Sequence, residues 1–158
     1  MKPINLKRLA TAILIPEAVG FIAALLSGSM GDAYNNYVQP PLSPPAIVFP
    51  IAWAILYGLM GVASYVFYEA TARKTAMRNE GLLFYGLQLG VNFLWPIIFF
   101  RLEAYLVAFA VLLILIVLTV ITAVKFKKHS DTAFYLLVPY IVWLIFAAYL
   151  NLGVAILN

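Results

Sequence analysis

The apolar segment 82–100 carries aromatic and amide side chains on a single face. These side chains recur at spacings of three and four residues, which places them on one side of a helix: Tyr85, Gln88, Asn92 and Trp95. A carboxamide is costly in hydrocarbon unless it is hydrogen-bonded, so we expect this face to point into a helix bundle. Aromatic rings with a few fixed amides are the chemistry of a pocket that binds an apolar small molecule.

Two other apolar segments repeat this pattern. Trp53 and Tyr57 share a face of segment 46–68, and Tyr140, Trp143, Ala147 and Asn151 share a face of segment 133–157. The alternative interpretation is a belt of aromatic rings at the membrane surface. It fits Trp53 and Trp143 less well, because both lie well inside their segments and share a face with polar groups. The sequence therefore predicts a cavity between three helices.

The sequence gives little support for a metal site, for thiol chemistry or for binding of nucleic acid. There is no cysteine, and the single histidine, His129, lies in the polar run KFKKHSD. Thiol nucleophiles, thiolate metal sites and a buried imidazole ligand are therefore excluded, and we expect neither a metal nor a cofactor. The basic residues form no stripe on a soluble domain, so nucleic acid is not an expected partner.

The composition indicates the elements that hold these faces. The chain is 65% hydrophobic and 10% charged, with a mean hydropathy of +1.00, which indicates an integral membrane protein in contact with a lipid bilayer. Runs of about 20 apolar residues cross a bilayer as helices. Five occur, at 9–26, 46–68, 82–100, 104–124 and 133–157. We expect an all-α fold, a single transmembrane domain over residues 1–158 built as a five-helix bundle.

The basic residues indicate an orientation. Nine of the ten lie before the first span or in the connectors after the second and fourth spans, and only Arg101 lies on the other side. The positive-inside rule then predicts a cytoplasmic N-terminus and an external C-terminus, in what we expect to be a bacterial plasma membrane. The connector 29–45, which ends in the stiff run QPPLSPP, would face outward and cover the cavity.

Two further features leave alternatives open. Gly86 and Gly90 form a GxxxG pair that suits the interface of a homodimer, or equally the packing of helices inside one bundle. Glu17 is the one acidic residue well inside a span. It serves either in proton coupling or contact with a polar ligand group, or as a neutral carboxylic acid hydrogen-bonded within the bundle.

Three motifs in this order resemble the TspO/translocator protein family, also called tryptophan-rich sensory proteins or peripheral benzodiazepine receptors. They are PPLSPPAIVFPIAWAILYGLMGVASY, LFYGLQLGVNFLWPIIFF and LLVPYIVWLIFAAYLNL, and with five spans the resemblance covers nearly the whole chain. The resemblance implies a five-helix bundle, commonly homodimeric, with a pocket beneath the first extramembrane loop. It also implies binding of porphyrins such as protoporphyrin IX and haem.

The resemblance and the helix faces together give one set of expected ligand-binding residues. They are Tyr34, Pro44, Pro45, Ile47, Trp53, Tyr57, Gln88, Asn92, Trp95, Trp143 and Ala147. The function we expect is a membrane binding protein for porphyrins and similar hydrophobic ligands, in sensing, sequestration or transport. One alternative is degradation of protoporphyrin IX in light and oxygen, with Trp53 and Trp143 as catalytic residues. A small proton-coupled transporter that uses Glu17 is the other.

Overall fold

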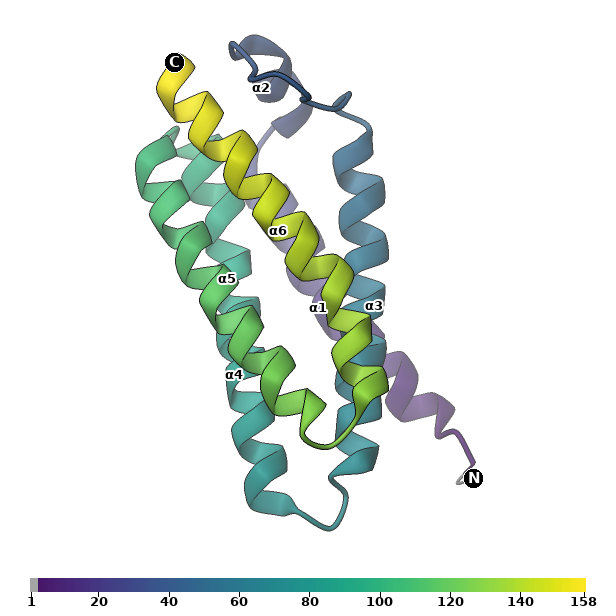
Figure 1. The fold of residues 1–158 in the computed structure, drawn as a ribbon. Coiled ribbons are helices and arrows are strands. Elements are labelled where there is room, and N and C mark those ends of the chain that lie inside the picture. Colours follow the sequence, from purple (N-terminus) through teal and green to yellow (C-terminus); the bar gives the residue numbers. More distant parts are fainter. Residues whose placement is uncertain (1–2) are drawn as a thin grey trace.

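The computed structural model describes residues 3–158, which form a bundle of long helices (Figure 1). The five long elements are α1 (Leu6–Ser27), α3 (Val48–Ala70), α4 (Thr75–Pro96), α5 (Tyr105–Lys127) and α6 (Asp131–Leu157). A short helix, α2 (Met30–Asn36), lies at the end of the bundle that also holds the C-terminus, and a π-helical turn, η1 (Ile97–Arg101), extends α4. No strand occurs among residues 3–158.

The five predicted spans are confirmed as helices long and apolar enough to cross a membrane. Most extend a few residues beyond the predicted limits, because the helix continues into the polar residues that flank the apolar run and begins at a polar cap. The side chain of Asn5 accepts a hydrogen bond from the backbone N–H of Arg8 at the start of α1, and that of Ser130 accepts one from Ala133 at the start of α6. The connector 29–45 is not all loop, since α2 forms inside it.

The core lies between α3, α4, α5 and α6. Its largest fully buried side chains include Met60 and Phe67 of α3, Phe126 of α5 and Tyr140 of α6, and the rings of Phe67 and Phe126 stack with centroids 4.1 Å apart. Many leucine, isoleucine and valine side chains point outward instead. An outer surface of this kind is expected for a bundle whose solvent is lipid.

Helix α1 approaches α3 closely because both carry glycine at the contact. A Cβ on Gly61 would lie 2.5 Å from the Cα of Ile13 and 2.6 Å from the carbonyl oxygen of Ala12. A Cβ on Gly20 would lie 2.1 Å from the ring of Tyr57. Small residues at such crossings let helix backbones pack closely in membranes.

The α3–α4 and α5–α6 connectors, which with the adjoining helix ends hold most of the basic residues, lie at the end of the bundle away from α2 (Figure 1). Arg8 at the start of α1 pairs with Glu69 at the end of α3 at 3.1 Å, and Lys125 of α5 pairs with Glu80 of α4. Arg101 lies at the opposite end, where its guanidinium donates to the carbonyl of Leu26. The connectors are therefore arranged as the orientation requires, while the orientation itself stays a prediction. Lys2, which contributed to it, lies outside the described residues.

Replacing Gly61 by alanine should destabilise the bundle. The added methyl group would meet backbone atoms of α1, which cannot move aside as a side chain can. We expect a loss of about 1–3 kcal/mol in the free energy of unfolding, the usual cost of overpacking. Thermal unfolding of the purified protein in detergent measures it.

Gly58→Ala on the same helix is the matched control. Its Cβ would meet only a carboxylate oxygen of Glu17, at 3.7 Å, an ordinary contact. A midpoint lowered equally in both variants would contradict the proposed close approach at Gly61.

Candidate ligand-binding cavity

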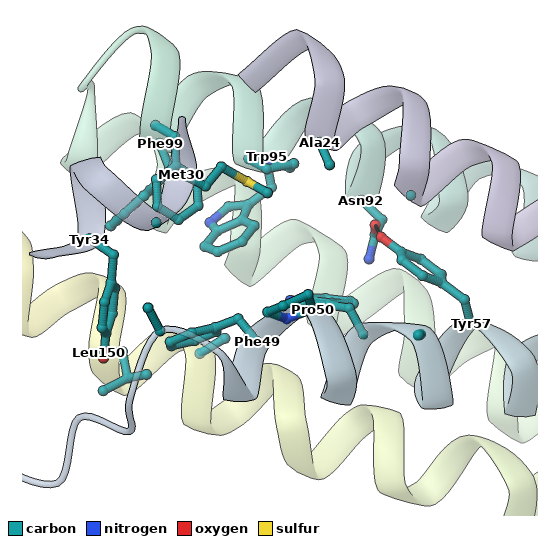
Figure 2. A pocket seen from close by; sticks show the side chains of 18 of the residues that line it. Ala24, Met30, Tyr34, Phe49, Pro50, Tyr57, Asn92, Trp95, Phe99 and Leu150 are labelled. Carbon is teal, nitrogen blue, oxygen red and sulfur yellow. Dashed lines mark hydrogen bonds between the residues drawn. The ribbon is translucent and has the colours of Figure 1, made fainter. Parts of the chain in front are cut away.

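A cavity of about 540 Å³ lies beneath α2, between α1, α3, α4 and α6 (Figure 2). Its volume is in the range of small-molecule sites, about 300–1,000 Å³. The lining from α1 and α2 consists of Glu17, Gly20, Phe21, Ala24, Met30, Gly31 and Tyr34. The lining from segment 46–57 consists of Ala46, Ile47, Phe49, Pro50, Trp53, Ala54 and Tyr57. The remaining lining residues are Asn92, Trp95, Pro96, Phe99, Phe100, Ala147, Leu150, Asn151 and Val154.

A chain of hydrogen bonds closes the deep end of the cavity. The hydroxyl of Tyr57 donates to Oδ1 of Asn92 at 2.6 Å, and Nδ2 of Asn92 donates to the hydroxyl of Tyr140 at 2.8 Å. The Tyr140 hydroxyl donates in turn to Oε1 of Gln88 at 2.9 Å. Figure 2 shows the facing side chains of Tyr57 and Asn92. The chain joins α3, α4 and α6 and satisfies the Asn92 carboxamide in a region where water is scarce.

A second pair of hydrogen bonds fixes the ring of Trp95. Its Nε1 donates to Oδ1 of Asn151 at 3.0 Å, and Nδ2 of Asn151 donates to the backbone carbonyl of Tyr105 at 2.8 Å. The ring also stacks on Phe99 of η1, with centroids 5.5 Å apart. Trp95 therefore presents a rigid aromatic face to the cavity, with both polar ends of Asn151 satisfied.

Trp53 lies at the centre of the aromatic wall. Its ring is stacked with Tyr57 at a centroid distance of 5.4 Å and lies 6.5 Å from Trp95. The rings of Tyr140 and Trp143 meet it edge-on, at 6.1 and 6.5 Å. Aromatic pairs in these arrangements are attractive beyond the area that they bury.

The cover of the cavity is held to the bundle at several points. The hydroxyl of Tyr34 in α2 donates to the carbonyl of Pro44 at 2.6 Å, and its ring meets Phe49 edge-on at 4.9 Å. Burial raises the pKa of the Tyr34 hydroxyl, so it remains a protonated donor at neutral pH.

The connector after α2 is pinned to α6. Asn158 exchanges two hydrogen bonds of 2.9 Å with the backbone of Val38, and the hydroxyl of Tyr149 donates to the carbonyl of Pro41 at 2.7 Å. Gly153 leaves space for the ring of Pro40, since a Cβ there would lie 2.5 Å from it. The proline run is therefore a fixed rim.

The structure brings seven of the expected ligand-binding residues together in the cavity lining. These are Tyr34, Ile47, Trp53, Tyr57, Asn92, Trp95 and Ala147. Four expected residues lie outside the lining. Pro44 accepts the Tyr34 hydrogen bond, Pro45 is exposed on the rim, and Gln88 lies one turn below Asn92. Trp143 packs against Phe49, 6.0 Å between centroids, and its Nε1 is buried without a hydrogen-bond partner among residues 3–158. The part that any of the eleven plays in ligand binding stays a prediction.

The expected dimer residues lie on the outside of the chain. Gly86 and Gly90 are exposed, and a Cβ on either would meet nothing within 4 Å. Within one chain they therefore pack no other helix, and a homodimer through them stays a prediction.

Sequence reasoning missed the wall that α1 and α2 contribute. Gly20, Phe21 and Ala24 of α1 and Met30 of α2 have no polar periodicity that would mark a face. Asn151 lies on the face of segment 133–157 that the spacing predicts to point into the cavity, although it is not among the expected ligand-binding residues, and Phe99 continues the predicted face of Trp95. Glu17 was noticed for its charge, and it lines the cavity without an ion pair among residues 3–158.

The lining offers the contacts that a flat apolar molecule would need. Its rings offer stacking surfaces, and the amide groups of Asn92 and Asn151 with the carboxyl of Glu17 are its polar points. Within residues 3–158 no group of three histidine, cysteine or acidic side chains gathers where a metal could bind.

Asn92→Ala should lower the stability of the protein. The substitution leaves the hydroxyls of Tyr57 and Tyr140 without their shared partner, and we expect a loss of about 1–3 kcal/mol. Thermal unfolding in detergent measures the change. Asn35→Ala on the exposed face of α2 is the control. Equal midpoints for Asn92→Ala and wild type would show that the buried chain of hydrogen bonds contributes nothing to stability.

Comparison with known proteins places the chain in a family. The model of the TspO/MBR family matches residues 12–157. The tryptophan-rich protein TspO of Archaeoglobus fulgidus is 33% identical over 155 residues, which cover 98% of this chain and 99% of that protein. A translocator protein homolog of Schizosaccharomyces pombe is 39% identical over 94% of this chain and 90% of its own length. The translocator protein of Ovis aries is 34% identical over 87% and 82%. With its five membrane-spanning helices, the chain belongs to the TspO/MBR family.

Proposed function

We propose that this protein binds porphyrins and similar flat hydrophobic molecules in the membrane, in the cavity beneath α2. The observation that carries the proposal is the cavity itself, about 540 Å³ with the rings of Trp53 and Trp95 in its wall. Two flat aromatic surfaces suit a planar macrocycle, and the space between bundle helices is a common place for such sites. A sensing or transport role accords with the names of two relatives, a tryptophan-rich sensory protein of Cereibacter sphaeroides and the translocator protein of Ovis aries, and sequestration of the ligand is the remaining possibility.

The polar groups of the lining suit a metal-free porphyrin better than tightly ligated haem. The lining holds no histidine, and the chain has no cysteine, so neither of these axial ligands for iron is supplied there. Of the other side chains that can bind haem iron, the lining holds Met30 and two tyrosines, Tyr34 and Tyr57, whose hydroxyls are already hydrogen-bonded. The amides of Asn92 and Asn151 are already hydrogen-bonded to neighbouring residues. They hold the aromatic walls in position, and the rings then provide the contact area for the ligand.

Trp53→Phe should weaken the binding of protoporphyrin IX. The smaller ring removes part of the stacking surface, and aromatic pairs of this kind contribute about 0.5–1.5 kcal/mol, so we expect a dissociation constant about twofold to thirteenfold higher. The shift of the porphyrin absorption band on titration with protein in detergent measures binding without relying on tryptophan fluorescence.

Trp143→Phe is the matched control, since this ring lies behind Phe49 and outside the lining. We expect it to raise the dissociation constant less than Trp53→Phe does. An unchanged dissociation constant in Trp53→Phe would place the porphyrin elsewhere.

A second candidate function is degradation of bound protoporphyrin IX in light. The edge-to-face contact of Trp53 with Trp143, 6.5 Å between centroids, supports it. This contact places a half-buried indole directly behind one that lines the cavity. Molecular oxygen would be the oxidant. The lining has no paired acid and base or activated nucleophile for hydrolysis, so turnover would proceed through the excited porphyrin and radicals on the indoles.

Illumination of the porphyrin complex tests this second function. We expect a coloured product that forms only in light and oxygen, and its formation should stop in Trp143→Phe while porphyrin binding persists. Product formed at the same rate in detergent without protein would contradict it.

A further inference from the structure

A second hollow lies between α1, α3 and α4 at the charged end of the bundle. We call it the α1–α4 groove, and its volume is about 500 Å³. The apolar part of its lining consists of Ala12, Ile15, Leu82, Gly86 and Leu89. None of these residues lines the cavity beneath α2. The groove is therefore a separate place at which the bundle is incompletely filled.

The wall of the groove contains a polar group that lacks a partner. Tyr85 is 93% buried, and its hydroxyl makes no hydrogen bond within residues 3–158. The hydroxyl of Ser64 stands beside it and donates to the carbonyl of Gly61 in its own helix, so its lone pairs are a weak competing acceptor for the Tyr85 proton. A buried hydroxyl without a partner is costly, and the cost is removed when a ligand supplies a hydrogen-bond acceptor.

The mouth of the groove is cationic. Lys7 and Arg8 line it, and Arg8 pairs with Glu69 at 3.1 Å. The guanidinium groups of Arg8 and Arg78 lie 5.6 and 4.8 Å from the ring of Tyr68, which also lines the groove. Lys7 and Arg8 at the mouth, with Arg78 over the ring of Tyr68, thus outnumber the one carboxylate that pairs with them, Glu69, and the excess positive charge suits an anion.

We propose that the α1–α4 groove binds one anionic phospholipid. The phosphate binds Lys7 and Arg8 at the mouth, an acyl chain follows Ala12, Ile15 and Leu89, and the Tyr85 hydroxyl donates to a carbonyl oxygen of the lipid esters. Basic pockets between membrane helices bind acidic headgroups in this way.

The competing occupant is a second copy of this chain, because Gly86 belongs to the GxxxG pair. The charges favour the lipid. A parallel copy packed symmetrically on this face would bring a second cationic mouth close to the first, together with a Glu69 that its own Arg8 already pairs. A phospholipid supplies both the anion and the hydrogen-bond acceptor.

Native mass spectrometry of the purified protein tests the proposal, with dioleoyl-phosphatidylglycerol and dioleoyl-phosphatidylcholine titrated separately in a neutral detergent. We expect one phosphatidylglycerol per chain, held more tightly than phosphatidylcholine. Lys7→Gln should weaken this binding about fivefold, the usual effect of one basic residue at an anionic headgroup. Tyr85→Phe should weaken the retention of both lipids, because it removes the hydroxyl that donates to an ester carbonyl, and both lipids carry that ester. Lys74→Gln is the control, since it removes the same charge from an exposed position outside the groove.

A filled groove gives an independent test. Gly86→Phe adds a ring where a Cβ meets nothing within 4 Å, so the bundle can accommodate it while the acyl chain is displaced. Gly90→Phe, one turn along the same face and outside the lining, should retain the lipid.

Three results would overturn the proposal. They are equal retention of the two lipids by wild type, undiminished phosphatidylglycerol binding in Gly86→Phe, and a dimer that retains no lipid and dissociates on Gly86→Phe. The last would assign the groove to a second copy. Porphyrin binding is measured separately, so neither result depends on the other.

Discussion

The hydrogen bonds of the Asn92 carboxamide are the interaction on which the rest of the bundle depends. They join Tyr57 of α3 to Tyr140 of α6 through α4, at a depth where water cannot replace a lost partner. Lipid provides little hydrophobic force between helices, so a fixed polar contact decides which faces meet. Once these three faces are joined, Trp53 and Trp95 must lie above the contact, and the cavity forms between them and α1. Gly20 completes the arrangement, because only glycine leaves room for the ring of Tyr57.

The two ends of the bundle are held by different means. At the end with α2, backbone groups of the connector pair with Asn158 and Tyr149 of α6, so the rim over the cavity is fixed by neutral hydrogen bonds. At the other end, ion pairs join α1 to α3 and α4 to α5. Exposed ion pairs contribute little to stability, but charges at one end do set how a bundle lies in a membrane. One end is therefore held by neutral hydrogen bonds over the cavity, and the other carries the charges that orient the bundle in the membrane.

The sequence predicts those parts of the fold and the cavity that polar periodicity marks. The sequence predicts that Tyr57, Asn92, Trp95 and Ala147 line the cavity, and they do. Polar or small side chains that recur among apolar residues mark one face of a helix, and that face has to point inward. Gln88 has the same spacing, yet it lies outside the lining, because periodicity gives the direction of a side chain and not its depth. Trp143 shares a face with Ala147, but Phe49 stands between its ring and the cavity, and only the packing of α3 against α6 determines that. The helix α2 escaped prediction because its seven residues, MGDAYNN, are too few and too mixed to give an apolar period.

Helix α1 shows most clearly why the cavity wall is harder to predict than the fold. Its composition predicts a membrane span, yet only Pro16, Ala23 and Ser27 are buried, so most of its surface faces lipid. Polar contacts hold it near its ends, through Arg8 with Glu69 and through the carbonyl of Leu26 with Arg101. Between them it rests on the glycine contact with α3. An apolar helix seated on glycine has no polar pattern from which its inner face could be read. Its rotation follows from the close approach at Gly61, and that rotation turns Glu17 and Ala24 toward the cavity.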